Sequence, residues 1–96
     1  MRMMLMVELD TEKVNPRVAD GSITDVLQGI LEKLKPEAAY FYARGGRRAF
    51  TLVVDAPDAA SLPSLAEPFW QEGNAHVEAF PCMNADELQE GIGRLG

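Results

Sequence analysis

Cysteine, histidine and tryptophan each occur only once in this chain of 96 residues, as Cys82, His76 and Trp70. A lone cysteine excludes an internal disulfide. One cysteine and one histidine also leave too few of the usual ligands for a structural zinc site built from a single chain. We therefore expect neither a metal nor another cofactor, and a chain suited to the reducing cytoplasm.

Positive charge and long apolar runs are also scarce. Nine Lys and Arg residues face fifteen Asp and Glu residues, for a net charge of -6. An acidic chain repels phosphate backbones and anionic membrane surfaces. The apolar run from Met3 to Val7 is shorter than the ~7–15 residues of a signal peptide, and no segment approaches the ~20 needed to span a bilayer. We expect a soluble cytoplasmic protein without nucleic-acid or membrane partners.

What is present is the composition of an ordinary globular domain. Apolar residues make up 47% of the chain and charged residues 25%, so disorder is not expected. A chain of this length has room for one hydrophobic core only. We expect one domain spanning residues 1–96.

The clearest local pattern is a β-hairpin between Tyr40 and Asp55. Its turn is Gly45-Gly46, and glycine accepts the positive φ angles that a two-residue hairpin turn requires. This turn places Phe41 opposite Phe50 on one face of the hairpin. On the other face it pairs Tyr42 with Ala49, and Tyr40 with Thr51.

The rest of the chain divides by periodicity and by turn residues. Residues 3–9 and 75–81 alternate as strands, and residues 11–21 are polar and contain Pro16, which predicts a loop. Residues 22–35 carry an apolar stripe at helical spacing. A shorter helix is expected from Asp58 to Leu65 or Ala66, before Pro68 breaks the pattern. A final helix, residues 85–95, begins with the capping-box pair Asn84 and Glu87.

The expected order is therefore β-α-β-β-α-β with a terminal helix. With right-handed crossovers it gives a ferredoxin-like α+β fold, an antiparallel four-stranded sheet with helices on one face. The other face would hold an apolar patch of a kind that usually marks an interface. We expect a second copy to cover it, in a sheet-to-sheet homodimer; the alternative is that the final helix folds back over it. The expected helix-facing residues are Leu5, Val7, Leu9, Ala39, Phe41, Phe50, Leu52, Val54, Val77 and Ala79, and those opposite are Met4, Met6, Glu8, Tyr40, Tyr42, Thr51, Val53, His76, Glu78 and Phe80.

The chain resembles the dimeric α+β barrel superfamily in element order and in two segments. It opens with MLMVE and closes its sheet with HVEAFPC, as some small uncharacterised bacterial proteins do. The segment PFWQEGNAHVEAFP is similar to the C-terminal segment of muconolactone isomerases. Antibiotic-biosynthesis monooxygenases resemble the chain more distantly, in overall shape. The resemblance implies a barrel made by two subunits. It does not imply one reaction, because this fold serves isomerases, monooxygenases and proteins without known activity.

Polar residues on the second face are the candidates for chemistry. Glu78 and His76 could shuttle a proton within an apolar barrel, with Glu8 beside them; alternatively, these groups hydrogen-bond across the interface or lie wet at the barrel mouth. Arg44, Arg47 and Arg48 flank the hairpin turn, where they could hold a carboxylate or phosphate; the expected role is that of a solvated hairpin tip. The predicted ligand-binding set is Glu8, Tyr40, Tyr42, Phe69, Trp70 and Phe80, although the aromatic members also suit plain packing.

Two functions remain open from the sequence. The first is a small homodimeric barrel that binds an aromatic or carboxylated molecule, with any catalysis being cofactor-independent isomerisation or oxygenation. The second is a non-catalytic structural or interaction protein with a filled barrel. An open cavity of a few hundred Å³ would favour the first.

Overall fold

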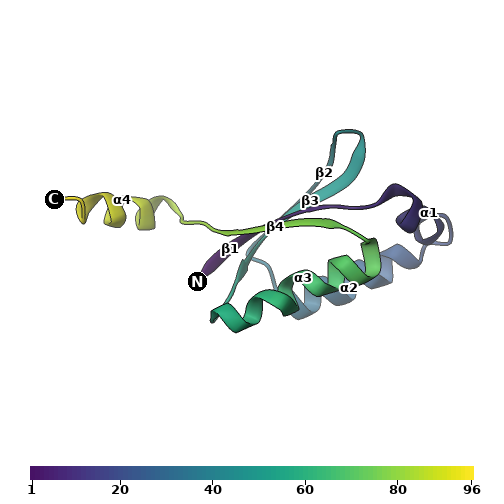
Figure 1. The fold of residues 1–96 in the computed structure, drawn as a ribbon, viewed down its shortest axis with the longest axis horizontal. Helices are drawn as coiled ribbons and strands as arrows, with labels where there is room; N and C mark the ends of the chain where they lie inside the picture. The colour runs from purple at the N-terminus through teal and green to yellow at the C-terminus, as the bar shows by residue number, and fades with distance from the viewer.

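The sheet sets the architecture of the chain. A computed structural model describes residues 1–96, and its four antiparallel strands lie in the order β2-β3-β1-β4 (Figure 1). This order, with two crossover helices on one face, is the predicted ferredoxin-like α+β fold. The strands are β1 (Arg2–Glu8), β2 (Ala38–Arg44), β3 (Arg47–Asp55) and β4 (His76–Pro81).

The predicted hairpin register is confirmed. Phe41 pairs with Phe50, Tyr42 with Ala49, and the strands close at Arg44 and Arg47. Gly45 and Gly46 have φ angles of 59° and 79°, a left-handed conformation that side chains with a Cβ rarely adopt. The turn chemistry therefore fixed which side chains share each face.

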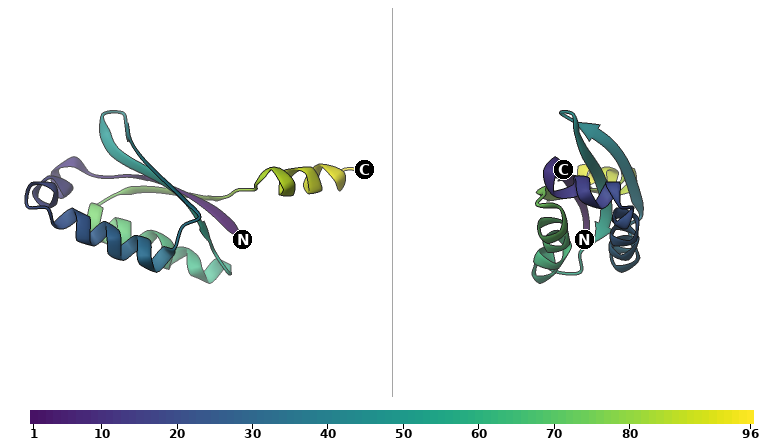
Figure 2. Two further views of the ribbon diagram at one scale, coloured as in Figure 1. Left: turned by 180° about the vertical axis from the view of Figure 1, so that it is seen from behind. Right: turned by 90° about the vertical axis from the view of Figure 1, so that its right-hand side faces the viewer.

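The core lies between the sheet and two helices, α2 (Ser22–Leu34) and α3 (Leu62–Gly73). Figure 2 shows these helices side by side beneath one face of the sheet. β1 alternates between buried and half-buried residues along its whole length, as expected of a strand with one face on a core. The core cluster is Met3, Leu5, Val7, Leu9, Val14, Phe50, Leu52, Val54, Ala56, Leu65 and Phe69.

The expected loop over residues 11–21 is largely a helix, α1 (Thr11–Ala19). The Asp10 side chain caps it by accepting a hydrogen bond from the backbone N–H of Lys13 at 3.0 Å. Val14 is fully buried and anchors the helix to the core. The expectation failed because one apolar anchor gives no detectable stripe, and Pro16 was given the weight of a helix breaker.

The second crossover helix is longer than expected. A short 3-10 helix (Ala59–Ser61) precedes α3, which then continues through Pro68 to Gly73. Leu65 and Phe69 are buried on the same side of α3, and burying two such side chains is worth about 3–6 kcal/mol in total. That gain offsets the ~3 kcal/mol cost of a proline within a helix. Phe69 and Trp70 therefore lie near the end of α3.

Two residues of the expected helix-facing set are not enclosed. Phe41 packs beside Phe50, with ring centroids 5.5 Å apart, yet it is 55% exposed. Ala79 is exposed as well. Both lie on edge strands of the sheet, where α2 and α3 cover them only in part.

The terminal helix α4 (Ala85–Gly93) begins with the predicted capping box between Asn84 and Glu87. It extends away from the body in line with β4 (Figure 1). The expected alternative, in which this helix folds back over the sheet, is therefore not the arrangement adopted. No helix of the chain is long and apolar enough to cross a membrane.

Candidate functional site

The sheet face opposite α2 and α3, here called the open face, carries three cross-strand rows of side chains. Strand pairing places neighbouring members of a row directly opposite one another, close enough to interact. Read from β4 to β2, the first row is His76, Glu8, Ala49 and Tyr42; the second is Glu78, Met6, Thr51 and Tyr40; the third is Phe80, Met4, Val53 and Ala38.

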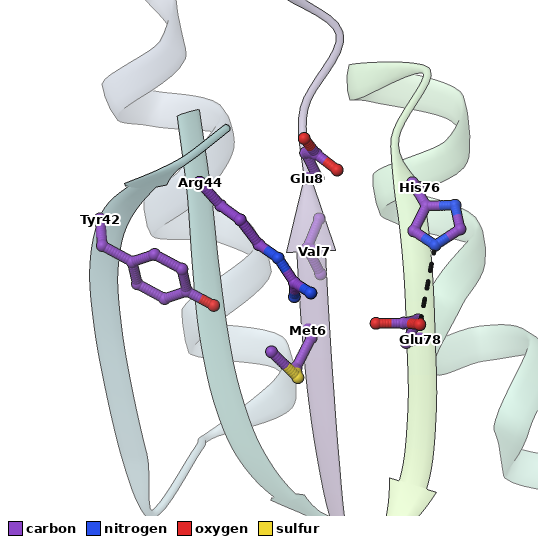
Figure 3. Close-up of a pocket in the computed structure, with 7 residues that line it drawn as sticks. All are labelled: Met6, Val7, Glu8, Tyr42, Arg44, His76 and Glu78. Atoms are coloured by element: carbon purple, nitrogen blue, oxygen red, sulfur yellow. Dashed lines mark ion pairs between the residues drawn. The ribbon is translucent and has the colours of Figure 1, made fainter. Parts of the chain in front are cut away.

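A small hollow lies over the first two rows, at the hairpin end of the sheet (Figure 3). Its volume is about 100 Å³. This is well below the roughly 300 Å³ at which ligand pockets usually begin. The lining residues are Met6, Val7, Glu8, Tyr42, Arg44, His76 and Glu78.

Three acid–base groups meet at this hollow. The His76 Nε2 atom lies 3.9 Å from the Glu78 Oε1 atom, both on β4 (Figure 3). Glu8 lies directly across from His76 on β1. The His76 side chain is 71% exposed and that of Glu78 51% exposed, so both are open to a partner or a ligand.

Tyr42 forms the wall of the hollow on β2. Its hydroxyl oxygen lies 2.6 Å from Thr51 Oγ1, which belongs to the second row. The contact is diagonal across the β2–β3 pair. It holds the phenol ring flat across the strands, and the ring edge faces the hollow (Figure 3).

Arg44 also lines the hollow, although the sequence favoured a solvated role for it over anion binding. Its guanidinium reaches over the sheet toward Met6 and Glu78 (Figure 3). The sequence interpretation placed it at a solvated hairpin tip. The signal that would have found it was already present, because Tyr40, Tyr42 and Arg44 alternate along β2 and so share the open face.

The predicted ligand-binding aromatic residues do not gather in one place. Phe69 lies on α3 in the core, with its ring centroid 5.3 Å from that of Phe50. Trp70 lies on the same helix, beside Asp10 and Lys13. Tyr40 and Phe80 are on the open face, in the second and third rows, but neither lines the hollow. Of the predicted set, Glu8, Tyr42, His76 and Glu78 are brought together.

The hollow combines both signs of charge with apolar walls. Arg44 offers a planar fork of donors suited to an oxyanion. Glu8 and Glu78 accept hydrogen bonds, and the imidazole of His76 offers one nitrogen donor and one nitrogen acceptor in its neutral form. No group of three or more His, Cys, Asp and Glu side chains lies close enough to hold a metal ion.

Comparison with known proteins gives a fold and no sequence family. No protein-family model matches the chain, and no curated protein sequence matches it. Among solved structures, it is similar to the 5-chloro-2-hydroxyhydroquinone dehydrochlorinase of Burkholderia phenoliruptrix AC1100, determined in complex with 2,5-dihydroxybenzoquinone. The TM-score is 0.67 at 14% identity, and the match covers 91% of this chain and 98% of the other. At this identity the likeness establishes a shared fold.

Proposed function

We propose that two copies of the chain pack open face to open face and enclose a site for a small planar molecule that carries an acidic oxygen, such as a phenol or an aromatic carboxylate. The observation that carries this proposal is the meeting of Arg44, Glu8, Glu78 and His76 at one hollow on an uncovered sheet face. Binding is the core of the proposal, and proton transfer is its catalytic extension.

The small size of the hollow supports the proposal of a second copy. One copy offers about 100 Å³, open on one side, whereas drug-sized ligands are enclosed in about 300–1,000 Å³. The open face of a second copy would close each hollow and add the space between the two faces to it. The apolar members of the open face, among them Met4, Met6 and Val53, also gain a cover in this way.

The side chains divide the work by chemistry. The Arg44 guanidinium would hold a phenolate or carboxylate oxygen through paired N–H donors. Met6 and the Tyr42 ring would pack against the ring of the ligand. Glu78 would accept the proton of a ring hydroxyl and His76 would deliver a proton to a ring carbon, which converts the enol form to its keto tautomer without any net change in protons. The product of such a step is an isomer of the substrate.

The structural neighbour supports the ligand class. The compound bound in the dehydrochlorinase structure is a small planar ring that carries two hydroxyl groups. Such hydroxyls are acidic and suit a site with one guanidinium and two carboxylates. We therefore use the compound bound in the neighbour as a probe. The ligand class proposed for this chain rests on the groups that line its own hollow.

Nuclear magnetic resonance offers a direct test, because the chain has one histidine and one tryptophan. His76 lines the hollow, whereas Trp70 lies on α3, across the sheet. We expect 2,5-dihydroxybenzoquinone or 4-hydroxybenzoate to shift the His76 ring protons while the Trp70 indole proton stays in place. Neutral cyclohexanol is the control, and no shift is expected with it.

The variant Glu78→Gln distinguishes an effect on ligand binding from an effect on the fold. We expect it to weaken binding of the same probes by about tenfold or more, since a hydrogen bond to a charged group is worth ~1.5–3 kcal/mol. Circular dichroism and light scattering should be unchanged. Glu67→Gln, an exposed carboxylate on α3, is the matched control. Equal binding by both variants would remove Glu78 from the site.

The second candidate is a structural or interaction protein with a filled barrel. It is favoured by the small volume of the hollow and by the Tyr42–Thr51 contact, which fills space on the open face. It predicts a dimer in which no probe moves the His76 signals, even at millimolar concentration. That result would refute the ligand proposal and support the structural role.

A further inference from the structure

The two edges of the sheet differ in how well they are protected against pairing with another strand. β2 and β4 are the edge strands, and each presents a row of unpaired backbone groups on its outer side. β4 ends in Pro81, which has no N–H to donate, and it also carries His76 and Glu78. β2 contains no proline, no lysine and no carboxylate over its seven residues. The β2 edge therefore lacks the features that usually prevent strand addition.

The backbone groups that β2 presents outward follow from the hydrogen bonds of the sheet. The N–H of Leu9 donates to the carbonyl oxygen of Arg48 at 2.9 Å, so the even-numbered residues of β3 bond to β1 and the odd-numbered ones to β2. The odd-numbered residues of β3 pair with the even-numbered residues of β2. The N–H and C=O groups that point away from the sheet therefore belong to Ala39, Phe41 and Ala43.

The β2 sequence is complementary to itself in one antiparallel register. When Phe41 lies opposite Phe41 of a second copy, all seven residues of the strand pair and the outward N–H and C=O groups meet. Tyr40 then faces Tyr42 of the other copy, twice over, and aromatic pairs across strands stabilise a sheet. Arg44, the one charged residue of β2, faces Ala38 and meets no like charge.

A groove beside the same edge also lacks a cover. It lies between α2 and β2, and its volume is about 560 Å³. Phe41 forms one wall and is 55% exposed, and Leu27 and Leu31 of α2 line the groove. The Phe41 ring of a second copy, directly across the two-fold axis, lies on this side of the joined sheet. Strand pairing would therefore cover apolar surface together with the unpaired backbone groups.

The length of the edge sets the strength of the contact. Seven residues rising ~3.3 Å each make a seam about 23 Å long, which is short for an interface that needs about 800 Å² per partner to be stable. The net charge of -6 on each copy also opposes association. We therefore expect pairing of β2 strands at protein concentrations well above the micromolar range.

We propose that β2 is a self-association edge, which pairs antiparallel with β2 of a second copy about a two-fold axis at Phe41. The partner is a copy of this chain because the register that pairs all seven residues of β2 pairs them with β2 itself. A two-fold contact of this kind closes after two copies and does not grow into a fibre. The edge is a different surface from the open face, so the inference goes beyond the proposed function and does not rest on it.

Disulfide trapping tests the register. In a Cys82→Ser background, one preparation carries Ala39→Cys and another carries Ala43→Cys, and both keep the aromatic side chains of β2. The two substituted positions lie opposite one another in the proposed register, with Cα atoms about 5.5 Å apart, and a disulfide needs about 4.4–6.8 Å. Two copies of either position lie four residues, about 13 Å, apart along the strand.

We expect a covalent dimer from the mixture, at submillimolar protein, and from neither preparation alone. A covalent dimer of Ala43→Cys alone would mean another register and would overturn the proposal. The absence of a covalent dimer from the mixture would do the same.

A pair of proline variants tests the edge itself. Ala43→Pro removes an outward N–H of β2 and leaves the hydrogen bonds to β3 in place. Ala79→Pro is the matched control on β4. The N–H of Cys82 donates to the carbonyl oxygen of Arg2 at 3.1 Å, so the even-numbered residues of β4 bond to β1 and Ala79 also points outward.

Sedimentation equilibrium from micromolar to millimolar protein supplies the measurement. By symmetry Ala43→Pro removes two hydrogen bonds from the seam, and we expect the dissociation constant of the high-concentration species to rise by about tenfold or more. Ala79→Pro should change it by less than about twofold. Equal constants for both variants would refute the β2 seam, as would a wild-type mass that does not increase over this range. Either result would leave the response of His76 to the probes, and so the proposed ligand site, untouched.

Discussion

Replacing Phe50 tests the core and the hairpin register together. The Phe50 side chain is 2% exposed, and its ring touches those of Phe41 and Phe69 at centroid distances of 5.5 Å and 5.3 Å. Removing a buried phenylalanine ring costs about 3–5 kcal/mol. The free energy of unfolding of a domain of this size is ~5–15 kcal/mol in total. We therefore expect Phe50→Ala to lower the urea midpoint by about 2 M, for a slope near 2 kcal/mol per M.

Phe41→Ala is the matched comparison, because Phe41 is the cross-strand partner with the same side chain. It is 55% exposed, so somewhat less than half of a burial energy of 1.5–3 kcal/mol is lost, about 0.7–1.4 kcal/mol. Both unfolding curves should be recorded at two protein concentrations about a hundredfold apart, since a loss that acts through dimerisation depends on concentration. Equal losses for the two variants in dilute protein would refute the packing described here.

Three further predictions concern assembly, backbone and pH. Light scattering at micromolar concentration should give roughly twice the 10.5 kDa chain mass, and Tyr42→Ala should weaken that dimer more than it destabilises the subunit; a monomer at every concentration would contradict the proposed assembly. Gly29→Ala should stabilise α2 by about 0.5–1 kcal/mol, because an added Cβ meets no atom within 4 Å. Gly46→Ala, at φ 79°, should destabilise the protein by about 1–2 kcal/mol. A higher melting temperature for Gly46→Ala than for Gly29→Ala would contradict this explanation. The hydrogen bond from the Ser22 backbone N–H lowers the pKa of Asp20 from its usual 3.8. The stabilisation by ionised Asp20 is therefore present above that pH and is lost as the pH falls through the lowered pKa of the folded state. An unshifted Asp20 titration in carbon-detected spectra would contradict this prediction.

Local chemistry explains which parts of the fold were predictable. The Gly45-Gly46 turn fixes the hairpin register within a few residues, and alternation at residues 76–80 orients β4. α1 was missed because its fold depends on one distant contact, the burial of Val14. α3 was cut short because Pro68 is a local breaker, while the burial of Phe69 that overrides it is a tertiary effect.

The candidate site was predictable to the extent that it depends on alternation. The positions of Glu8, His76 and Glu78 follow from strand parity and from the pairing of β1 with β4. For Arg44 a solvated role was favoured over anion binding because the residue adjoins the hairpin turn, although strand parity places it on the open face. Phe69 and Trp70 were wrongly expected in the ligand site because the end of α3 was not predicted. Side chains on a helix follow a period of about 3.6 residues rather than the period of two of a strand, so these two point elsewhere.

The position of β1 in the middle of the sheet has a consequence for synthesis of the chain. β1 is made before its neighbours, yet its two partners are residues 47–55 and 76–81. Synthesis must pass residue 81 before β1 is paired on both sides, and such long-range pairing slows folding. Until then the apolar run from Met3 to Val7 has unpaired edges, which favours aggregation. The acidic residues Glu8 and Asp10, directly after that run, act as gatekeepers during this interval.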